Sequence, residues 1–155
     1  MPAGSEPPGL PPLPRTWRPL GPRIMGIGVT VCLTIVVAVG WFTFDAETRA
    51  KFTTFQRGTL VAFGLLYLAL MFALLRSRAV AYADRLVVVN GYRRHEYEWP
   101  QIIAARLPPG APWVTLDLAD GETASVLGIQ GSDGDRARRA VRELKALVAA
   151  ASAAS

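Results

Sequence analysis

The strongest pattern along the chain is a pair of uncharged apolar runs. Ile24 to Phe44 contains 21 residues, Thr59 to Leu75 contains 17, and 14 residues separate the two runs. At about 1.5 Å per residue, a helix as long as the first run spans roughly 30 Å, the thickness of a bilayer's hydrocarbon core. The second run is shorter, but arginines on both sides of it reach the headgroups. The pattern predicts a hairpin of two transmembrane helices within residues 23–76.

After Arg78 the pattern changes to an alternation of apolar and polar residues, which is typical of strands. Asn90-Gly91 and Asp120-Gly121 predict two-residue hairpin turns, and Pro100 ends a strand. We therefore expect about six antiparallel strands in a small barrel or sandwich. Their expected positions are Ala79–Ala83, Leu86–Val89, Tyr92–Trp99, Ile102–Leu107, Trp113–Ala119 and Glu122–Leu127.

The last apolar pattern has helical spacing. Ser132 lies three residues before Asp135, which is a helix-start signature, and an apolar stripe follows it. The 80 residues from Arg76 onward suffice for one small α+β domain, which we place at residues 77–150 with a tail at 151–155. The stripe of the capping helix consists of Ala137, Val141, Leu144 and Val148.

The segment before the first apolar run is rich in proline. Residues 1–22 contain eight of the 12 prolines, which predicts a disordered tail. A secretory signal peptide is the alternative interpretation, because arginines precede the run and Ala38-Val39-Gly40 resembles a cleavage site. The run continues to Phe44, however, and exceeds the roughly 7–15 apolar residues of a signal peptide. A retained membrane span is therefore the expectation.

Basic residues flank the two runs and predict their orientation. Three lie before the first run, three follow the second, and three lie in the loop at residues 45–58. Two spans place both termini on one side, so six flanking charges oppose three. We expect a multi-pass protein of the plasma (inner) membrane with both termini in the cytoplasm. Trp41, Phe42 and Phe44 predict an aromatic belt at the outer interface.

Small residues in the second run suggest a helix-packing surface. Ala69 and Ala73 have the spacing that lets transmembrane helices approach closely. We expect these two residues to pack one span against the other. The alternative is a surface that joins two copies of the chain.

Four motifs after the spans carry a family resemblance. They are Val80-Ala-Tyr-Ala-Asp-Arg-Leu86, Trp99-Pro-Gln-Ile102, Leu116-Asp-Leu-Ala-Asp-Gly-Glu122 and Ile129-Gln-Gly-Ser-Asp-Gly-Asp135. With the two spans, they resemble actinobacterial membrane proteins that carry the low-molecular-weight protein antigen 6 type of bacterial PH domain, over about residues 20–150. The resemblance implies a membrane-tethered, PH-like domain and does not imply catalysis. The Ala83-Asp84-Arg85 turn has one arginine beside an acid, so it lacks the basic cluster of inositol-lipid-binding PH domains.

The residue patterns give little support to catalysis, metal binding or nucleic-acid binding. His95 is the only histidine, and we expect a partly buried ring with a structural role. Cys32, within a span, is the only cysteine, so neither an internal disulfide nor a cysteine metal site is expected, and no motif indicates a cofactor. The net charge of +5 is spread over the chain without interleaved aromatic residues, which argues against a nucleic-acid partner.

The remaining candidate surface is basic. We expect this surface to face anionic lipid near the membrane. The alternative is that Arg76 and Arg78 only fix the topology of the spans. The leading hypothesis is a non-enzymatic membrane protein whose PH-like domain binds a protein partner or anionic lipid at the cytoplasmic face. The alternative is a structural subunit of a cell-envelope complex that assembles through its spans. The candidate surface consists of Arg76, Arg78, Arg93, Arg94 and Arg106.

Overall fold

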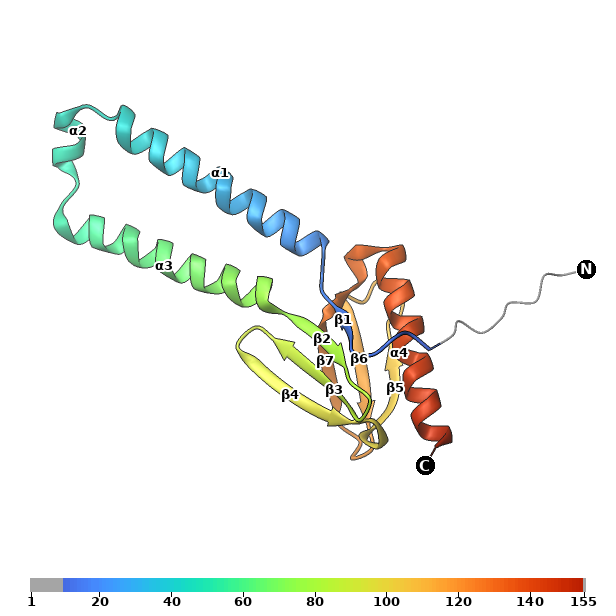
Figure 1. Cartoon of the computed structure of the whole chain (residues 1–155). Helices are drawn as coiled ribbons and strands as arrows, with labels where there is room; N and C mark the ends of the chain where they lie inside the picture. Colours follow the sequence, from blue (N-terminus) through green and yellow to red (C-terminus); the bar gives the residue numbers. More distant parts are fainter. Residues whose placement is uncertain (1–9, 155) are drawn as a thin grey trace, which may run out of the picture. The chain divides into compact units, whose positions relative to one another are not determined.

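The computed structural model describes residues 10–154 and divides into two compact units (Figure 1). One is the helical hairpin, residues 22–75. The other is a domain formed by the segment up to Gly21 together with the chain from Arg76 onward. The domain is therefore built from segments on both sides of the hairpin.

The helical hairpin consists of α1 (Gly21–Thr43) and α3 (Thr54–Arg76), which run side by side in opposite directions (Figure 1). Both helices are long and apolar enough to cross a membrane. None of the residues described in α1 and α3 is buried, so their apolar side chains are exposed or half-buried. A water-soluble protein rarely exposes so much contiguous apolar surface, and a bilayer accommodates it. The two predicted helices are thus present.

Side-chain contacts link the two helices of the hairpin. The hydroxyls of Thr30 and Tyr67 lie 3.0 Å apart, within hydrogen-bonding distance. One turn earlier on α1, Gly26 faces the sulfur of Met71, and a methyl group at Gly26 would lie 3.5 Å from it. The small residue therefore leaves room for the Met71 side chain, and small residues are common where membrane helices meet.

The loop of the hairpin contains a short helix, α2 (Ala46–Lys51), where the sequence indicated only a loop. Asp45 caps it by accepting a 2.8 Å hydrogen bond from the amide of Thr48. The rings of Trp41 and Phe52 meet edge to face at 5.9 Å, and the Arg57 guanidinium lies 5.6 Å from the Trp41 ring centre. Of the expected aromatic residues, Trp41 and Phe44 both contact the Phe52 ring at this end of the hairpin.

The first sheet of the domain has the order β1-β2-β3-β4, with every pair antiparallel. Arg15 to Trp17 pairs with β2 so that Trp17 lies opposite Ala79. The strands are β1 (Arg15–Trp17), β2 (Arg78–Ala81), β3 (Arg85–Asn90) and β4 (Arg93–Glu98).

The strand β1 departs from the expectation of a disordered tail over residues 1–22. Residues 15–17 are a strand, Trp17 and Pro19 are buried, and only residues 1–9 of that expected tail lie outside the described residues. Local composition suggested disorder, but pairing with β2 and burial of an indole stabilise the segment. At the other end, the last helix continues to Ala153, beyond the expected boundary at residue 150.

The second sheet has the order β5-β6-β7, again antiparallel. A short 3₁₀ helix, Trp99–Gln101, links the sheets where Pro100 ends the preceding strand, and a second one, Gly131–Asp133, precedes the last helix. The strands are β5 (Ile102–Arg106), β6 (Trp113–Leu118) and β7 (Thr123–Gln130). The described chain thus has seven strands in two sheets, not a closed barrel.

Asn90 joins the two sheets. Its side-chain amide donates a 2.6 Å hydrogen bond to the Ser125 carbonyl and accepts a 3.0 Å bond from the Leu127 amide, so it pairs with β7 as backbone would. Because Asn90 belongs to the strand, the turn lies one residue later than expected. Asn90 pairs with Arg93 at the end of the ladder, and the two-residue turn is Gly91-Tyr92, with Gly91 at φ +61°.

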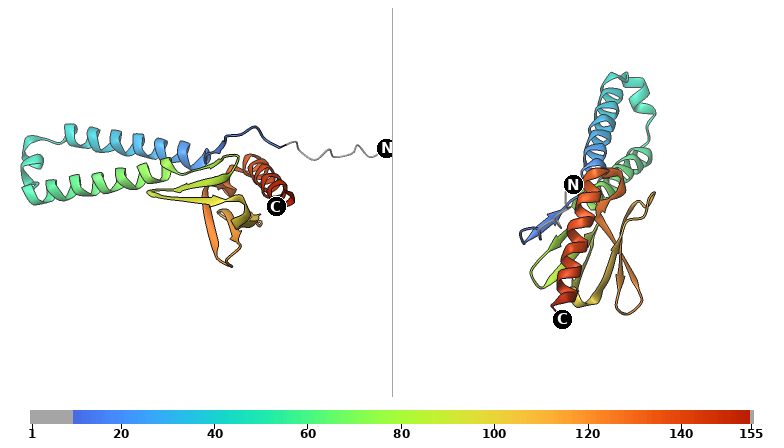
Figure 2. Two further views of the ribbon diagram at one scale, coloured as in Figure 1. Left: turned by 60° about the horizontal axis from the view of Figure 1, so that its bottom comes forward. Right: turned by 90° about the vertical axis from the view of Figure 1, so that its right-hand side faces the viewer.

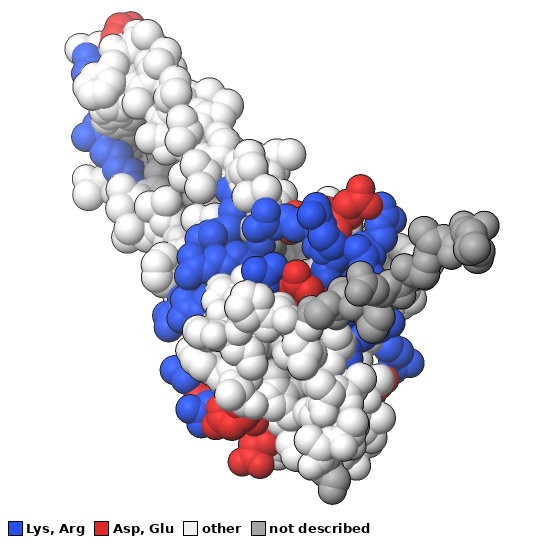
Figure 3. Space-filling model, turned by 45° about the vertical axis from the view of Figure 1, so that its right-hand side comes forward, with Lys and Arg blue, Asp and Glu red and all other residues white. Residues whose placement is uncertain are grey.

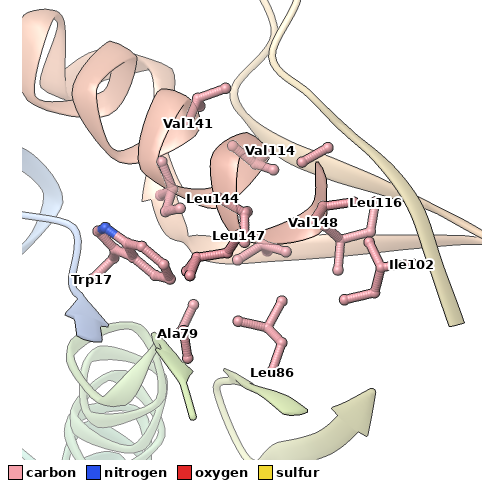
Figure 4. Packing of buried hydrophobic residues seen from close by; sticks show 14 of the residues in the cluster. Trp17, Ala79, Leu86, Ile102, Val114, Leu116, Val141, Leu144, Leu147 and Val148 are labelled. Atoms are coloured by element: carbon pink, nitrogen blue, oxygen red, sulfur yellow. The ribbon is translucent and has the colours of Figure 1, made fainter. Parts of the chain in front are cut away.

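The C-terminal helix α4 (Asp135–Ala153) covers the core of the domain (Figure 2). All four residues of the expected stripe are buried, and Ala140 and Leu147 join them. Figure 4 shows Leu144 and Leu147 of α4 next to the Trp17 indole of β1, with Ala79 and Leu86 of the first sheet nearby. Apolar residues from both sheets, β1 and α4 therefore form one core.

Candidate binding groove between β1 and α4

A cavity of about 310 Å³ lies between β1, the end of β7 and the first half of α4. Trp17, Ile129 and Ala140, all buried, contribute its apolar part. Ionisable side chains supply the polar part. We call this site the β1–α4 groove and define it by the six ionisable residues Arg15, Arg18, Asp133, Arg136, Arg139 and Glu143.

Secondary structure explains why these residues converge. Positions two apart on a strand share a face, so Arg15 and Trp17 point the same way. Positions separated by three, four and seven residues share one face of a helix, which applies to Arg136, Arg139 and Glu143. Hydrogen bonds from Arg15 and Trp17 to Glu143 join this face of β1 to that face of α4.

Glu143 is the hub of the groove. Its two oxygens accept 2.9 Å hydrogen bonds from Nε and Nη2 of Arg15, and the Trp17 indole donates a further 2.9 Å bond to Oε2. This bidentate geometry is the strong form of an arginine–carboxylate pair. It fixes β1 to α4 and leaves both charges compensated.

Asp133 holds the segment that follows β1. Its Oδ2 accepts a 2.9 Å hydrogen bond from the Leu20 amide, and its Oδ1 accepts a 2.7 Å bond from the amide of Gly21, the first residue of α1. A carboxylate bound by the first free amides of a helix is a stable cap. Both acids of the groove are therefore occupied by donors of the protein.

Three arginines of the groove keep their charge available. Within residues 10–154, Arg18, Arg136 and Arg139 have no carboxylate within 4.0 Å. Four arginines and two acids give the six defining residues a net formal charge of +2. Figure 3 shows basic side chains gathered in a band on one face of the protein, with a few acids among them. The groove thus has the electrostatics of an anion site.

The predicted basic surface is only partly assembled. Strand register places Arg78 opposite Val89 and Val89 opposite Arg94, so Arg78, Arg93 and Arg94 share one end of the first sheet, next to Arg76 in sequence. Arg94 pairs with Glu96 at 2.5 Å. Arg106 lies in the second sheet and pairs with Asp117. The five arginines do not line the β1–α4 groove, and their contact with lipid stays a prediction.

The alanines of the expected helix-packing surface lie on α3. Ala69 is exposed and Ala73 is half-buried. The contacts described above between α1 and α3 include Tyr67 and Met71 of α3. A role of Ala69 and Ala73 in packing, within or between copies, stays a prediction.

His95 differs from the expectation of a partly buried ring, because it is exposed and stacks on the Tyr97 ring at 6.2 Å. Burial raises the pKa of the Tyr97 phenol above its usual value, and the charges of Asp120 and Glu122 add to this effect. Within residues 10–154, no three histidine, cysteine or carboxylate side chains are grouped to hold a metal ion.

The groove was missed by sequence reasoning for two reasons. Arg15 and Arg18 lie in the segment that was expected to be a disordered tail, and the sequence pattern assigned no role to the arginines of α4. The available signal was Arg15-Thr16-Trp17, where a large aromatic residue alternates with a polar one among prolines. That spacing is typical of a short strand with one buried side chain.

Comparison with known proteins identifies the domain. Residues 76–147 match the family model described as Bacterial PH domain. Uncharacterized proteins of Mycobacterium tuberculosis and Mycobacterium bovis are 37% identical over 86 residues, which is 54% of this chain. The aligned part is 56% of those relatives, so the chain spans about half the length of the curated relatives it matches. No solved structure gives a significant match. The expected resemblance is confirmed, because residues 76–147 match the bacterial PH domain family, and β1 lies outside the matched segment.

Proposed function

We propose that this chain is a non-enzymatic, multi-pass protein of the plasma membrane that presents its PH domain to the anionic cytoplasmic leaflet. One observation carries the proposal. The neighbouring strands β1 and β2 lead into the two spanning helices, with residues 18–20 between β1 and α1 and only Ser77 between α3 and β2. A domain tethered twice over such short links stays at the membrane surface.

The charge distribution supports the cytoplasmic side. Arg18 and Arg23 flank the start of α1, and Arg76 and Arg78 flank the end of α3, so the domain end of the hairpin is basic. Basic flanks favour the cytoplasmic side, and each arginine near an anionic surface contributes about 1 kcal/mol. The same residues therefore favour both the orientation and the lipid partner.

Protease protection tests the orientation. A C-terminal epitope tag on the full chain is exposed to protease in right-side-out spheroplasts and in inverted vesicles. We expect digestion only in inverted vesicles, because both termini face the cytoplasm. A tag inserted between Lys51 and Phe52 provides the control and should behave in the opposite way. Digestion of the C-terminal tag in spheroplasts would refute the proposal and direct attention to the cell envelope.

A further inference from the structure

We propose that the β1–α4 groove is a binding site for the phosphate group of an anionic phospholipid, held by Arg18, Arg136 and Arg139. This inference rests on the proposed function and deepens it, because it assigns the lipid contact to a defined site. The site lies outside the predicted basic surface, and two of the groove's arginines, Arg15 and Arg18, lie outside the matched family segment.

The carboxylates of the groove do not compete for the ligand. Glu143 is occupied by Arg15 and the Trp17 indole, and Asp133 is occupied by two backbone amides. These bonds instead give the groove a fixed frame from which the other arginines extend. A frame that is already formed lowers the cost of ordering the site on binding.

The three remaining guanidinium groups suit a phosphate. Arginine presents a planar fork of donors that binds phosphate oxygens in pairs. Arg136 and Arg139 share a face of α4, and Arg18 enters from the segment after β1, so donors approach from two elements. The buried Trp17, Ile129 and Ala140 exclude water on one side, which strengthens charge interactions. At about 310 Å³, the cavity is at the lower end of the range for small ligands.

The position of Arg18 in the chain favours a lipid over a soluble phosphate. Arg18 precedes Gly21, the first residue of α1, by three residues. Three residues extend over at most about 10 Å, and the headgroup layer on each side of a bilayer is roughly 5–8 Å thick. The arginine backbone is therefore within side-chain reach of lipid phosphates once α1 spans the membrane.

Lipid retention by the full chain tests the site. The protein in detergent micelles is mixed with equal amounts of phosphatidylglycerol and phosphatidylcholine, and native mass spectrometry measures the ratio of bound lipids. We expect a clear preference of the unmodified chain for phosphatidylglycerol. The double variant R136Q/R139Q should lower that preference about 30-fold, because two surface charges are lost. The variant R18Q, which changes no helix residue, should lower it about fivefold.

The matched control is R138Q/R142Q. It removes the same charge from the same helix, but neither residue lines the groove, and Arg138 pairs with Asp135. Its lipid preference should stay within about threefold of the unmodified chain. Equal losses in both double variants would overturn the inference, because net charge alone would explain them.

Two further outcomes would also overturn the site. One is that the unmodified chain shows no preference for phosphatidylglycerol over phosphatidylcholine. The other is that glycerol phosphate raises the melting temperature of the unmodified chain as much as phosphatidylglycerol does, which would indicate a soluble ligand. Protease protection decides the proposed orientation independently. If the C-terminal tag proves cytoplasmic and either outcome is observed, the proposed orientation of the PH domain is retained and this lipid site is rejected.

Discussion

Gly128 provides a sharp test of how the two sheets meet. It is a buried residue of β7, and a methyl group at this position would lie 2.5 Å from the Ala79 amide nitrogen and 2.6 Å from the Arg78 carbonyl carbon. Both neighbours are backbone atoms of β2, which is paired on one side with β1 and on the other with β3. Substitution by alanine therefore cannot be relieved by a side-chain rotation.

The expected cost follows from this geometry. Carbon atoms pack best at about 3.5–4.0 Å, so the added methyl overlaps β2 by roughly 1 Å. Overpacking of a protein core costs about 1–3 kcal/mol, and we expect the upper end because a paired strand must move. In a domain of this size, each kcal/mol shifts the melting temperature by about 4–8 °C. G128A should therefore melt about 12–24 °C below the unmodified chain.

Thermal unfolding of the full chain in detergent measures this shift through the near-ultraviolet circular dichroism of the buried tryptophans Trp17 and Trp99. The control is G28A in α1, where an added methyl meets nothing within 4 Å, and its domain should melt within about 2 °C of the unmodified chain. A G128A domain that melts as late as the control would refute the close approach of β7 to β2.

Three further variants test the core, the sheet junction and a titration. Trp17→Ala should destabilise the domain by about 3–5 kcal/mol in denaturant unfolding, and a loss below 1 kcal/mol would contradict the burial of β1. Asn90→Ala removes both hydrogen bonds to β7 and should cost about 1–3 kcal/mol in the same assay, whereas a neutral effect would exclude the bridge. The pKa of Tyr97 is higher in the folded protein than its usual value of 10.0 in the unfolded chain, so the protonated phenol favours the folded state. This contribution to stability is complete below pH 10 and disappears as the pH rises through the higher pKa of the folded protein. The difference between absorbance titrations of the unmodified chain and Y97F should have its midpoint above 10.0, and a midpoint at or below that value would contradict the burial effect.

Most of the fold was predictable because its signals are local. The two apolar helices are recognisable from their long uncharged runs. The six strands of residues 78–130 are recognisable from the alternation of apolar and polar residues and from turn residues, and α4 from its apolar stripe. Strand β1 lacked such a signal, because three residues among prolines give no period. Its pairing partner, β2, lies more than 60 residues further along the chain, beyond the helical hairpin. Only a long-range contact therefore distinguishes it from a tail.

The candidate site was harder to predict for the same reason. Arg76, Arg78, Arg93 and Arg94 were recognisable because they are close in sequence to the end of a span or to a hairpin turn. The groove instead depends on β1 meeting α4, and on knowing that Glu143 and Asp133 are already bound. The sequence alone does not tell which acids cancel the charge of which arginines. The structure shows that Glu143 compensates Arg15 and that backbone amides bind Asp133, which leaves Arg18, Arg136 and Arg139 available.

The hairpin is topologically an insertion between two neighbouring strands. Because β1 precedes α1 and β2 follows α3, the first sheet forms only when both ends of the hairpin are brought together. The Trp17 indole and its bond to Glu143 stabilise that arrangement from the α4 side. Pairing of β1 with β2 therefore requires an even number of membrane crossings between them. A chain in which only one of the two helices crossed the bilayer would separate Trp17 from Ala79 and lose this part of the core.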